Sequence, residues 1–185
     1  MVYILLGNGF EEAEALVTAD VLRRGNLAVS LVGIGSLTIT GAHGISVLAD
    51  TLVENVGLAD GDTVLLPGGM GGVESIENSE AAMELIFQAA ADDTMYLAAI
   101  CAAPTLLARK GVIGVGSYAV CYPGMEELLL DAGVTPCMDA SVVLDGNLIT
   151  GKGPGTVFEF ALSLLEILAG EDTAAQVQAG LHYAV

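Results

Sequence analysis

Short apolar runs alternate along the chain with longer segments in which apolar residues recur at helical spacing. Such runs, bounded by turn residues, are typical of strands buried on both faces of a parallel sheet. Helical segments between them predict right-handed βαβ crossovers. We therefore expect strands at residues 2–6, 27–34, 63–66, 95–100 and 117–121, hairpins from residues 37–40 with 45–48 and 142–145 with 148–150, and helices at residues 11–24, 73–91, 125–132, 157–169 and 172–181.

Residues 95–110, MYLAAICAAPTLLARK, predict a buried strand that turns directly into a helix. Cys101 follows the strand at once, and Ala102 and Ala103 are small enough for a tight turn. Pro104 suits the first helical turn, which needs no N–H from it. Such a nucleophile elbow places a cysteine at a strand's carboxyl end and a helix N-terminus, where a thiolate is stabilised. The alternative is a buried cysteine that only fills space.

The predicted strand at residues 63–66 ends in the glycine-rich run Pro67-Gly68-Gly69-Met70-Gly71-Gly72. A run of this kind lets backbone N–H groups approach an oxyanion or a phosphate, although a flexible turn uses the same residues. It contains neither G-x-G-x-x-G nor the lysine of a Walker motif, so it gives little support to a nucleotide site.

Acidic residues open the first predicted helix, and arginines close it. Glu11, Glu12 and Glu14 lie in the first turn and Arg23 and Arg24 in the last. Both groups complement the helix dipole, which is a sufficient structural reason for most of these charges. Glu14 has a second interpretation, because it falls near the carboxyl end of the first strand, where parallel sheets bind their ligands.

Composition narrows the classes of function. The 185 residues fit a single domain, 1–185, and 54% of them are hydrophobic, which a sheet buried on both faces explains. No apolar run is long enough for a membrane helix, and no signal peptide is visible. The net charge of −18, with only 5 basic residues, argues against nucleic acid and acidic membranes as partners.

Cysteine and histidine usage points to a reducing environment without metal. Cys101, Cys121 and Cys137 are an odd number and form no C-x-x-C pair, which argues against a disulfide framework or a zinc site and favours the cytoplasm. His43 and His182 are too few for most histidine metal sites. We interpret His43, in the turn of the first hairpin, as a solvated turn residue.

Four segments together carry a family resemblance. They are Glu-Glu-Ala-Glu at residues 11–14, Leu-Pro-Gly-Gly at 66–69, Ala-Ala-Ile-Cys-Ala-Ala-Pro at 98–104 and Gly-Pro-Gly-Thr at 153–156. Over about residues 2–170 the chain resembles the DJ-1/PfpI superfamily, in its DJ-1/ThiJ-like branch. The resemblance implies a flavodoxin-like α/β three-layer sandwich, with a mostly parallel central sheet flanked by helices, a site without metal or cofactor, and a homodimer.

The resemblance also assigns site residues. Cys101 matches the reactive cysteine, and Glu14 matches the carboxylic acid that hydrogen-bonds its sulfur. Gly68, Gly69 and Ala102 match positions whose backbone N–H groups face the site. Further residues expected at the pocket are Arg24, His43, Tyr122, Gly153 and Pro154. Of these, Arg24 and His43 fall near positions that approach either the site or the dimer interface in the DJ-1 branch. Because a carboxylate repels a thiolate, we expect Glu14 to keep a proton while Cys101 is ionised.

Tyr122 stands where many superfamily members have a histidine that acts as general base, and a neutral tyrosine is a poor base at about pH 7. This disfavours a cysteine protease or amidase, unless His43 reaches the site across a dimer interface. We expect instead a cysteine-dependent enzyme that acts on small reactive dicarbonyls or early glycation adducts, of the glutathione-independent glyoxalase or deglycase kind. The alternative is a redox sensor or chaperone-like protein that works through oxidation of Cys101.

Overall fold

A seven-stranded sheet runs through the centre of the molecule, whose computed structural model describes residues 1–184. Its strand order is β10-β11-β7-β6-β1-β2-β5, and every neighbouring pair is parallel except β10 with β11. The strands of this sheet are β1 (Val2–Leu6), β2 (Val29–Gly33), β5 (Thr51–Leu52), β6 (Thr63–Leu66), β7 (Tyr96–Ile100), β10 (Val142–Asp145) and β11 (Leu148–Gly151).

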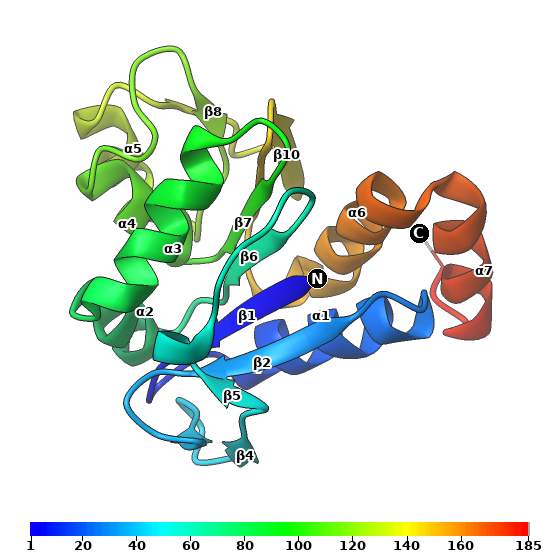
Figure 1. Ribbon diagram of the computed structural model, residues 1–185. Coiled ribbons are helices and arrows are strands. Elements are labelled where there is room, and N and C mark those ends of the chain that lie inside the picture. The colour runs from blue at the N-terminus through cyan, green and yellow to red at the C-terminus, as the bar shows by residue number, and fades with distance from the viewer. Residues whose placement is uncertain (185) are drawn as a thin grey trace.

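Helices cover both faces of the sheet, which confirms the predicted α/β three-layer sandwich (Figure 1). One face packs against α1 and α6, and the other against α2, α3 and α4. The helices are α1 (Glu12–Arg24), α2 (Met70–Glu77), α3 (Glu80–Ala91), α4 (Ala103–Arg109), α5 (Glu126–Asp131), α6 (Val157–Ala169) and α7 (Glu171–Gly180), with short 3-10 turns at Val53–Asn55 and Pro154–Thr156.

The central strands are apolar throughout because successive side chains enter two different cores. In β6, Val64 and Leu66 belong to the core beneath α2, α3 and α4, whereas Leu65 belongs to the core beneath α1 and α6. In β7, Leu97 and Ala98 divide in the same way. A continuous apolar run is therefore the correct signal for a strand in this sheet.

The helix predicted at residues 73–91 is two helices in the structure, α2 and α3. They separate at Asn78 and Ser79, where the Ser79 hydroxyl accepts the Ala82 backbone N–H at 3.2 Å and caps α3. Short polar side chains favour helix ends over helix interiors because they hydrogen-bond the free N–H groups there.

The strand predicted at residues 117–121 does not join the central sheet. Only β8 (Tyr118–Ala119) forms, in a separate two-stranded parallel sheet with β9 (Thr135–Pro136). The Val120 backbone N–H donates instead to the Thr150 hydroxyl of β11 at 3.0 Å. A side chain therefore satisfies this N–H group, and the segment crosses the end of the sheet without extending it. The short β5 was not predicted, because two residues give no periodicity.

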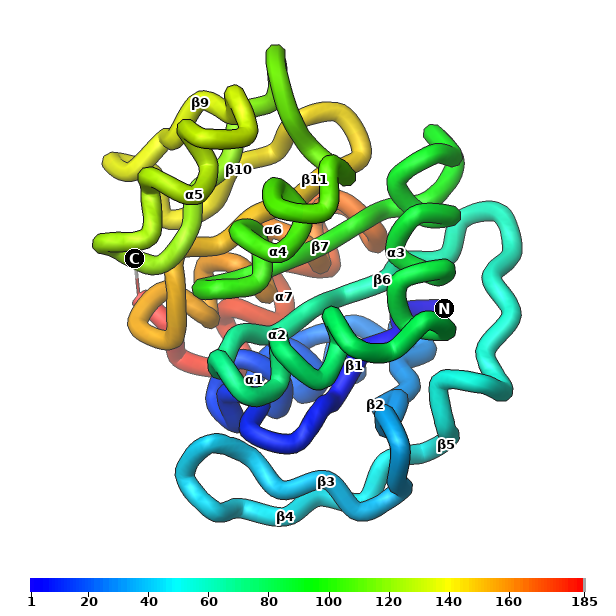
Figure 2. Tube along the Cα trace, turned by 90° about the vertical axis from the view of Figure 1, so that its left-hand side faces the viewer, coloured from blue at the N-terminus to red at the C-terminus, as the bar shows by residue number. Residues whose placement is uncertain are grey.

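The carboxyl ends of β1, β6 and β7 lie at one edge of the sheet, because these neighbours are parallel. Open α/β sheets bind their ligands at this edge. A hairpin of β3 (Thr38–Thr40) and β4 (Ser46–Leu48) lies beside the start of α1 (Figure 2). The Gly9 N–H donates to the Thr40 carbonyl and the Ala42 N–H to the Phe10 carbonyl, both at 2.8 Å. These bonds attach the hairpin to the carboxyl edge of the sheet.

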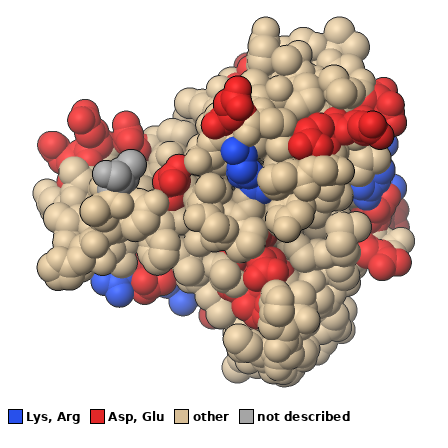
Figure 3. Space-filling view, turned by 180° about the vertical axis from the view of Figure 1, so that it is seen from behind, with Lys and Arg blue, Asp and Glu red and all other residues tan. Residues whose placement is uncertain are grey.

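The surface carries few basic side chains. Figure 3 shows acidic groups distributed over one face with basic groups between them, as expected for 23 acidic and 5 basic residues. Within residues 1–184, none of the helices has both the length and the apolar character needed to cross a bilayer.

Candidate functional site

Cys101 occupies a strained turn between β7 and α4. Its φ is +65°, a value that non-glycine residues rarely adopt. Its N–H donates to the Gly151 carbonyl at 2.9 Å, and its carbonyl accepts the Tyr122 N–H at 2.8 Å. Neighbouring segments thus hold the strained conformation on both sides. This geometry is the predicted nucleophile elbow, and it leaves the residue 9% exposed.

Glu14 lies beneath Cys101, in the first turn of α1, with no exposed surface. Its Oε2 accepts the Gly68 backbone N–H at 2.6 Å. A Cβ on Gly68 would come within 2.6 Å of the Cys101 Cβ and 2.7 Å of Glu14 Oε2. Because Gly68 has no side chain, the Cys101 sulfur and the Glu14 carboxyl group can approach each other at this position.

The expected backbone donors divide into two roles. The N–H groups of Ala102 and Gly69 face the Cys101 sulfur and act to lower its pKa, as the resemblance implies. The N–H of Gly68 also faces the site but donates to Glu14, so Gly68 supports the acid rather than the sulfur. Gly69 has a φ of +82°, and a Cβ there would overlap the Gly9 carbonyl oxygen.

Glu14 and Cys101 form a coupled titrating pair. Burial raises the pKa of Glu14 to about 7, which agrees with the expected protonated acid. Burial, followed by the charge of Glu14, raises the pKa of the Cys101 thiol. This upward direction differs from the resting thiolate that the sequence led us to expect, because desolvation outweighs the two N–H donors. The pair therefore holds at least one proton at neutral pH, and the sulfur ionises most easily when Glu14 carries that proton.

A cavity of about 470 Å³ opens over the sulfur. Six of the predicted residues line it, namely Cys101, Gly69, Ala102, His43, Tyr122 and Pro154. Glu11, Met70 and Met125 line it as well and were not predicted. Gly153 does not line the cavity but lies behind Tyr122, since a Cβ on Gly153 would be 3.2 Å from the Tyr122 ring. Gly153 thus lets the tyrosine pack against the backbone.

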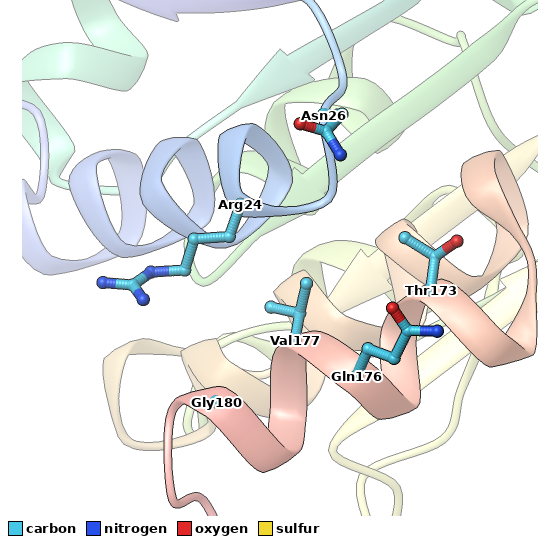
Figure 4. A pocket seen from close by; sticks show the side chains of 6 residues that line it. All are labelled: Arg24, Asn26, Thr173, Gln176, Val177 and Gly180. Carbon is cyan, nitrogen blue, oxygen red and sulfur yellow. The ribbon is translucent and has the colours of Figure 1, made fainter.

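Arg24 lies elsewhere in this chain. It belongs to the last turn of α1, about 15 Å along the helix from Glu14 at the usual rise per residue. Its Nε donates to Asp20 Oδ2 at 2.7 Å. It lines a separate hollow of about 320 Å³ beside α7, with Thr173, Gln176 and other residues (Figure 4). Arg24 therefore does not line the Cys101 cavity of its own chain, and its place at a dimer interface stays a prediction.

His43 is more than a solvated turn residue. Its Nδ1 lies 2.8 Å from Oε2 of the buried Glu12, and its backbone N–H donates to Glu12 Oε1 at 2.7 Å. Helix-dipole stabilisation alone therefore does not account for Glu12. The glycines on either side of the turn, Gly41 and Gly44, are the sequence signal that could have indicated a tightly packed turn.

Glu11, Glu12 and His43 also place one ligand-type atom each within 4.8 Å of one another. The Glu12 oxygens already accept hydrogen bonds from His43 and from the Ile45 N–H. Hydrogen bonding to the turn accounts for this cluster, and we assign it on that basis rather than as a metal centre.

Comparison with known proteins places this geometry in a family. The model of the DJ-1/PfpI family matches residues 1–167. The Drosophila melanogaster protein dj-1beta is 38% identical over 179 residues, which cover 96% of this chain and 94% of that protein. The Caenorhabditis elegans glutathione-independent glyoxalase DJR-1.2 is 33% identical over 162 residues, 88% of this chain and 84% of that protein.

Structural similarity agrees with the sequence comparison. The crystal structure of Drosophila melanogaster DJ-1beta superposes with a TM-score of 0.92 at 36% identity, covering 100% of this chain and 98% of that chain. The family model, the relatives and the shared fold all extend across the segments that carry Cys101 and Glu14. The chain belongs to the DJ-1/PfpI family.

Proposed function

We propose that this protein converts small 2-oxoaldehydes, such as glyoxal and methylglyoxal, into hydroxy acids through Cys101 and without glutathione. The observation that carries the proposal is the coupled pair of Glu14 and Cys101 beneath an open cavity, with two N–H groups facing the sulfur. The relative named as a glutathione-independent glyoxalase supports it.

The first step forms a carbon–sulfur bond. Glu14 takes the thiol proton of Cys101, the sulfur attacks the aldehyde carbon, and the C=O π bond opens. The resulting oxyanion lies among the N–H groups of Gly69 and Ala102 and takes the proton back from Glu14. The product is a hemithioacetal, and Glu14 is again a carboxylate.

The second step moves one proton between neighbouring carbons and one between their oxygens. Glu14 removes the proton from the former aldehyde carbon, which gives an enediolate, and returns it to the adjacent carbon, while the hydroxyl proton of the former aldehyde oxygen passes to the neighbouring oxygen. A pKa of about 7 suits a group that must accept and release a proton in succession. The product is a 2-hydroxy thioester on Cys101, and hydrolysis then releases the hydroxy acid and the free thiol. The sum is one added water, with no external oxidant.

The same chemistry extends to early glycation adducts, because hemiaminals and hemithioacetals release the free aldehyde reversibly. A deglycase activity is therefore expected in proportion to the rate at which the adduct dissociates. Comparing adduct loss with free aldehyde release, measured separately, distinguishes this route from direct attack on the adduct.

The experiment is lactate formation from methylglyoxal without glutathione. Cys101→Ser and Glu14→Gln are each expected to lose at least roughly 10²-fold in kcat/KM, because one removes the nucleophile and the other the proton carrier. Cys121→Ser and Cys137→Ser are the matched controls and should retain the activity. Full turnover by Cys101→Ser would contradict the proposal.

The redox-sensor hypothesis uses the same sulfur and stays a prediction, as do the homodimer and the cytoplasmic location. Selective oxidation of Cys101 without any dicarbonyl turnover would favour the sensor. Tyr122, in place of the usual histidine, disfavours a protease or amidase, but His43 lines the same cavity, so amide hydrolysis is an activity to assay beside methylglyoxal conversion.

A further inference from the structure

The β3–β4 turn brings a histidine into the Cys101 cavity from within the same chain. His43 and Cys101 both line this cavity of about 470 Å³. The turn is attached to the start of α1 through the Ala42 N–H, which donates to the Phe10 carbonyl at 2.8 Å. The side chain of His43 is 67% exposed, so it stands at the open side of the cavity.

Glu12 fixes the orientation of the His43 imidazole. Its Oε2 lies 2.8 Å from Nδ1, while its Oε1 accepts the backbone N–H groups of His43 at 2.7 Å and Ile45 at 3.3 Å. A Cβ on Gly41 would overlap the Glu12 carboxyl group, so the turn is built around it. With Nδ1–H donating to a carboxylate, Nε2 is the nitrogen left to take up or release a proton.

The electrostatics of this pair favour a basic imidazole. Burial opposes ionisation of Glu12, but its hydrogen bonds to His43 and Ile45 hold its pKa down at about 2. The hydrogen bond to Glu12, and then the charge of Glu11, raise the pKa of His43 above its ordinary value. The other ionisable side chains at the cavity are Glu11, Cys101 and Tyr122, with Glu14 behind the sulfur.

Thioester hydrolysis needs a base on the side from which water arrives. Glu14 is fully buried, and its Oε2 is held by the Gly68 N–H. Water reaches Cys101 through the open cavity, which His43 lines. The proton carrier of the isomerisation and the base of the hydrolysis are therefore expected to be different residues.

We propose that the Glu12–His43 pair activates water for hydrolysis of a thioester on Cys101. This inference rests on the proposed function. His43 Nε2 takes a proton from water as the oxygen attacks the thioester carbonyl. The tetrahedral intermediate then collapses, the C–S bond breaks, and the imidazolium returns its proton to the departing sulfur. His43 is the catalytic base, and Glu12 is a positioning residue that acts through it.

Acyl transfer from 4-nitrophenyl acetate tests the step without any dicarbonyl. The compound acetylates the cysteine, and intact mass together with peptide mapping locates the acetyl group and follows its loss. Wild type should release acetate from Cys101 at a rate that rises with pH through the pKa of His43, since only the neutral imidazole accepts a proton. His43→Gln should deacylate at least roughly tenfold more slowly, accumulate acetyl-Cys101 and lose this pH dependence.

Control variants separate this role from a structural one. His182→Gln changes the other histidine, which does not line the cavity, and should behave as wild type. Tyr122→Phe tests the competing hydroxyl, and its deacylation should keep the pH dependence that His43 sets. Glu12→Gln should keep a pH-dependent step but shift it to lower pH, because an amide stabilises the imidazolium less. The rate of iodoacetamide reaction with Cys101 should change less than about twofold in His43→Gln.

The outcomes separate the inference from the proposed function. Deacylation of His43→Gln at the wild-type rate and pH dependence overturns the inference, as does slow deacylation in Tyr122→Phe alone. If His43→Gln is slow but wild type does not convert methylglyoxal, the proposed substrate is wrong and the acid–base role stands. A wild type whose Cys101 cannot be acetylated overturns both.

Discussion

Glu12 and Glu14 are two residues apart on one helical turn, both are buried, and their pKa values move in opposite directions. Glu12 is held near 2 and Glu14 near 7. Side chains two positions apart face different directions on a helix. Glu12 therefore meets the N–H groups of the β3–β4 turn, whereas Glu14 meets Cys101 and a single N–H from Gly68.

The number of donors and the depth of burial together decide the difference. Glu12 receives two backbone N–H groups and an imidazole N–H. Among residues 1–184, Glu14 Oε1 has no hydrogen-bond partner, so burial dominates and the neutral acid is favoured. The start of α1 thus supplies two acids with different roles in one site. Glu12 stays ionised and Glu14 carries a proton, because their surroundings differ.

The largest expected effects come from filling the glycine space beside each acid. Gly41→Ala would press on Glu12, and Gly68→Ala on Glu14 and Cys101. Each should lower the free energy of unfolding by about 2–4 kcal/mol, measured by urea denaturation. Gly44→Ala is the control, because among residues 1–184, apart from its two chain neighbours, no atom lies within 4 Å of its added Cβ. It should cost only about 1 kcal/mol for its φ of +83°. Equal losses in all three variants would contradict this packing.

Glu14→Gln should stabilise the fold at alkaline pH. The folded-state pKa of Glu14 is raised from 4.5 to about 7, so the folded state binds more protons than the unfolded state between these values. Wild-type stability therefore falls as pH rises through this window. The variant should gain about 2–3 kcal/mol above pH 7 and nothing below about pH 4.5, measured by urea denaturation across pH. A gain that is constant with pH would show that the Glu14 carboxyl does not titrate in this way.

Glu12→Gln should have the opposite effect. The folded-state pKa of Glu12 is lowered to about 2. The stability that its carboxylate contributes is therefore present at pH values above the unfolded-state pKa and is lost as the pH falls through the folded-state pKa. We expect a loss of about 1–2 kcal/mol at pH 7, less than the shift alone implies, because the carboxylate lies near solvent and is screened. The loss should shrink as the pH approaches 2. Glu11→Gln, at an acid without these hydrogen bonds, is the matched control.

The smallest expected effect is on the rate at which peroxide oxidises Cys101, which should depend on Glu14 but not on Glu12. Mild oxidation is expected to add two oxygens to Cys101, which lines the open cavity, and to spare Cys121, which has no exposed surface and does not line it. Glu14→Gln should change the rate at Cys101, whereas Glu12→Gln should leave it within about twofold. Peptide mass spectrometry gives both rates. Equal oxidation of Cys101, Cys121 and Cys137 would remove the basis for a sensor.

Local signals sufficed for the elbow and its acid. A buried strand, a cysteine and a helix opened by proline specify a turn whose geometry follows from the backbone. The chain order also places Glu14 at the carboxyl edge of the sheet. These features depend on neighbouring residues and on parallel strand order, both of which a sequence contains.

Contacts between distant segments were not predictable in the same way. His43 reaches Glu12 across 31 positions of sequence, and no periodicity indicates which way a hairpin folds. That the Gly68 N–H donates to Glu14 was not predictable, because a glycine gives no sign of where its N–H points. Arg24 lies at the opposite end of α1 from Glu14, and the sequence does not show whether it meets the site of a second copy. Each of these features depends on a direction in space rather than on an element.

The hydrogen bond from the Tyr122 N–H to the Cys101 carbonyl makes one amide a reporter on the reactive turn. Exchange of this hydrogen for solvent deuterium requires the turn to open, so its protection measures how often the elbow loses its shape. An adduct on the sulfur that relaxes the left-handed conformation would accelerate this exchange while amides in β6 stay protected. The state of the cysteine can then be followed in solution at a single backbone position, with substrate, oxidant or neither present.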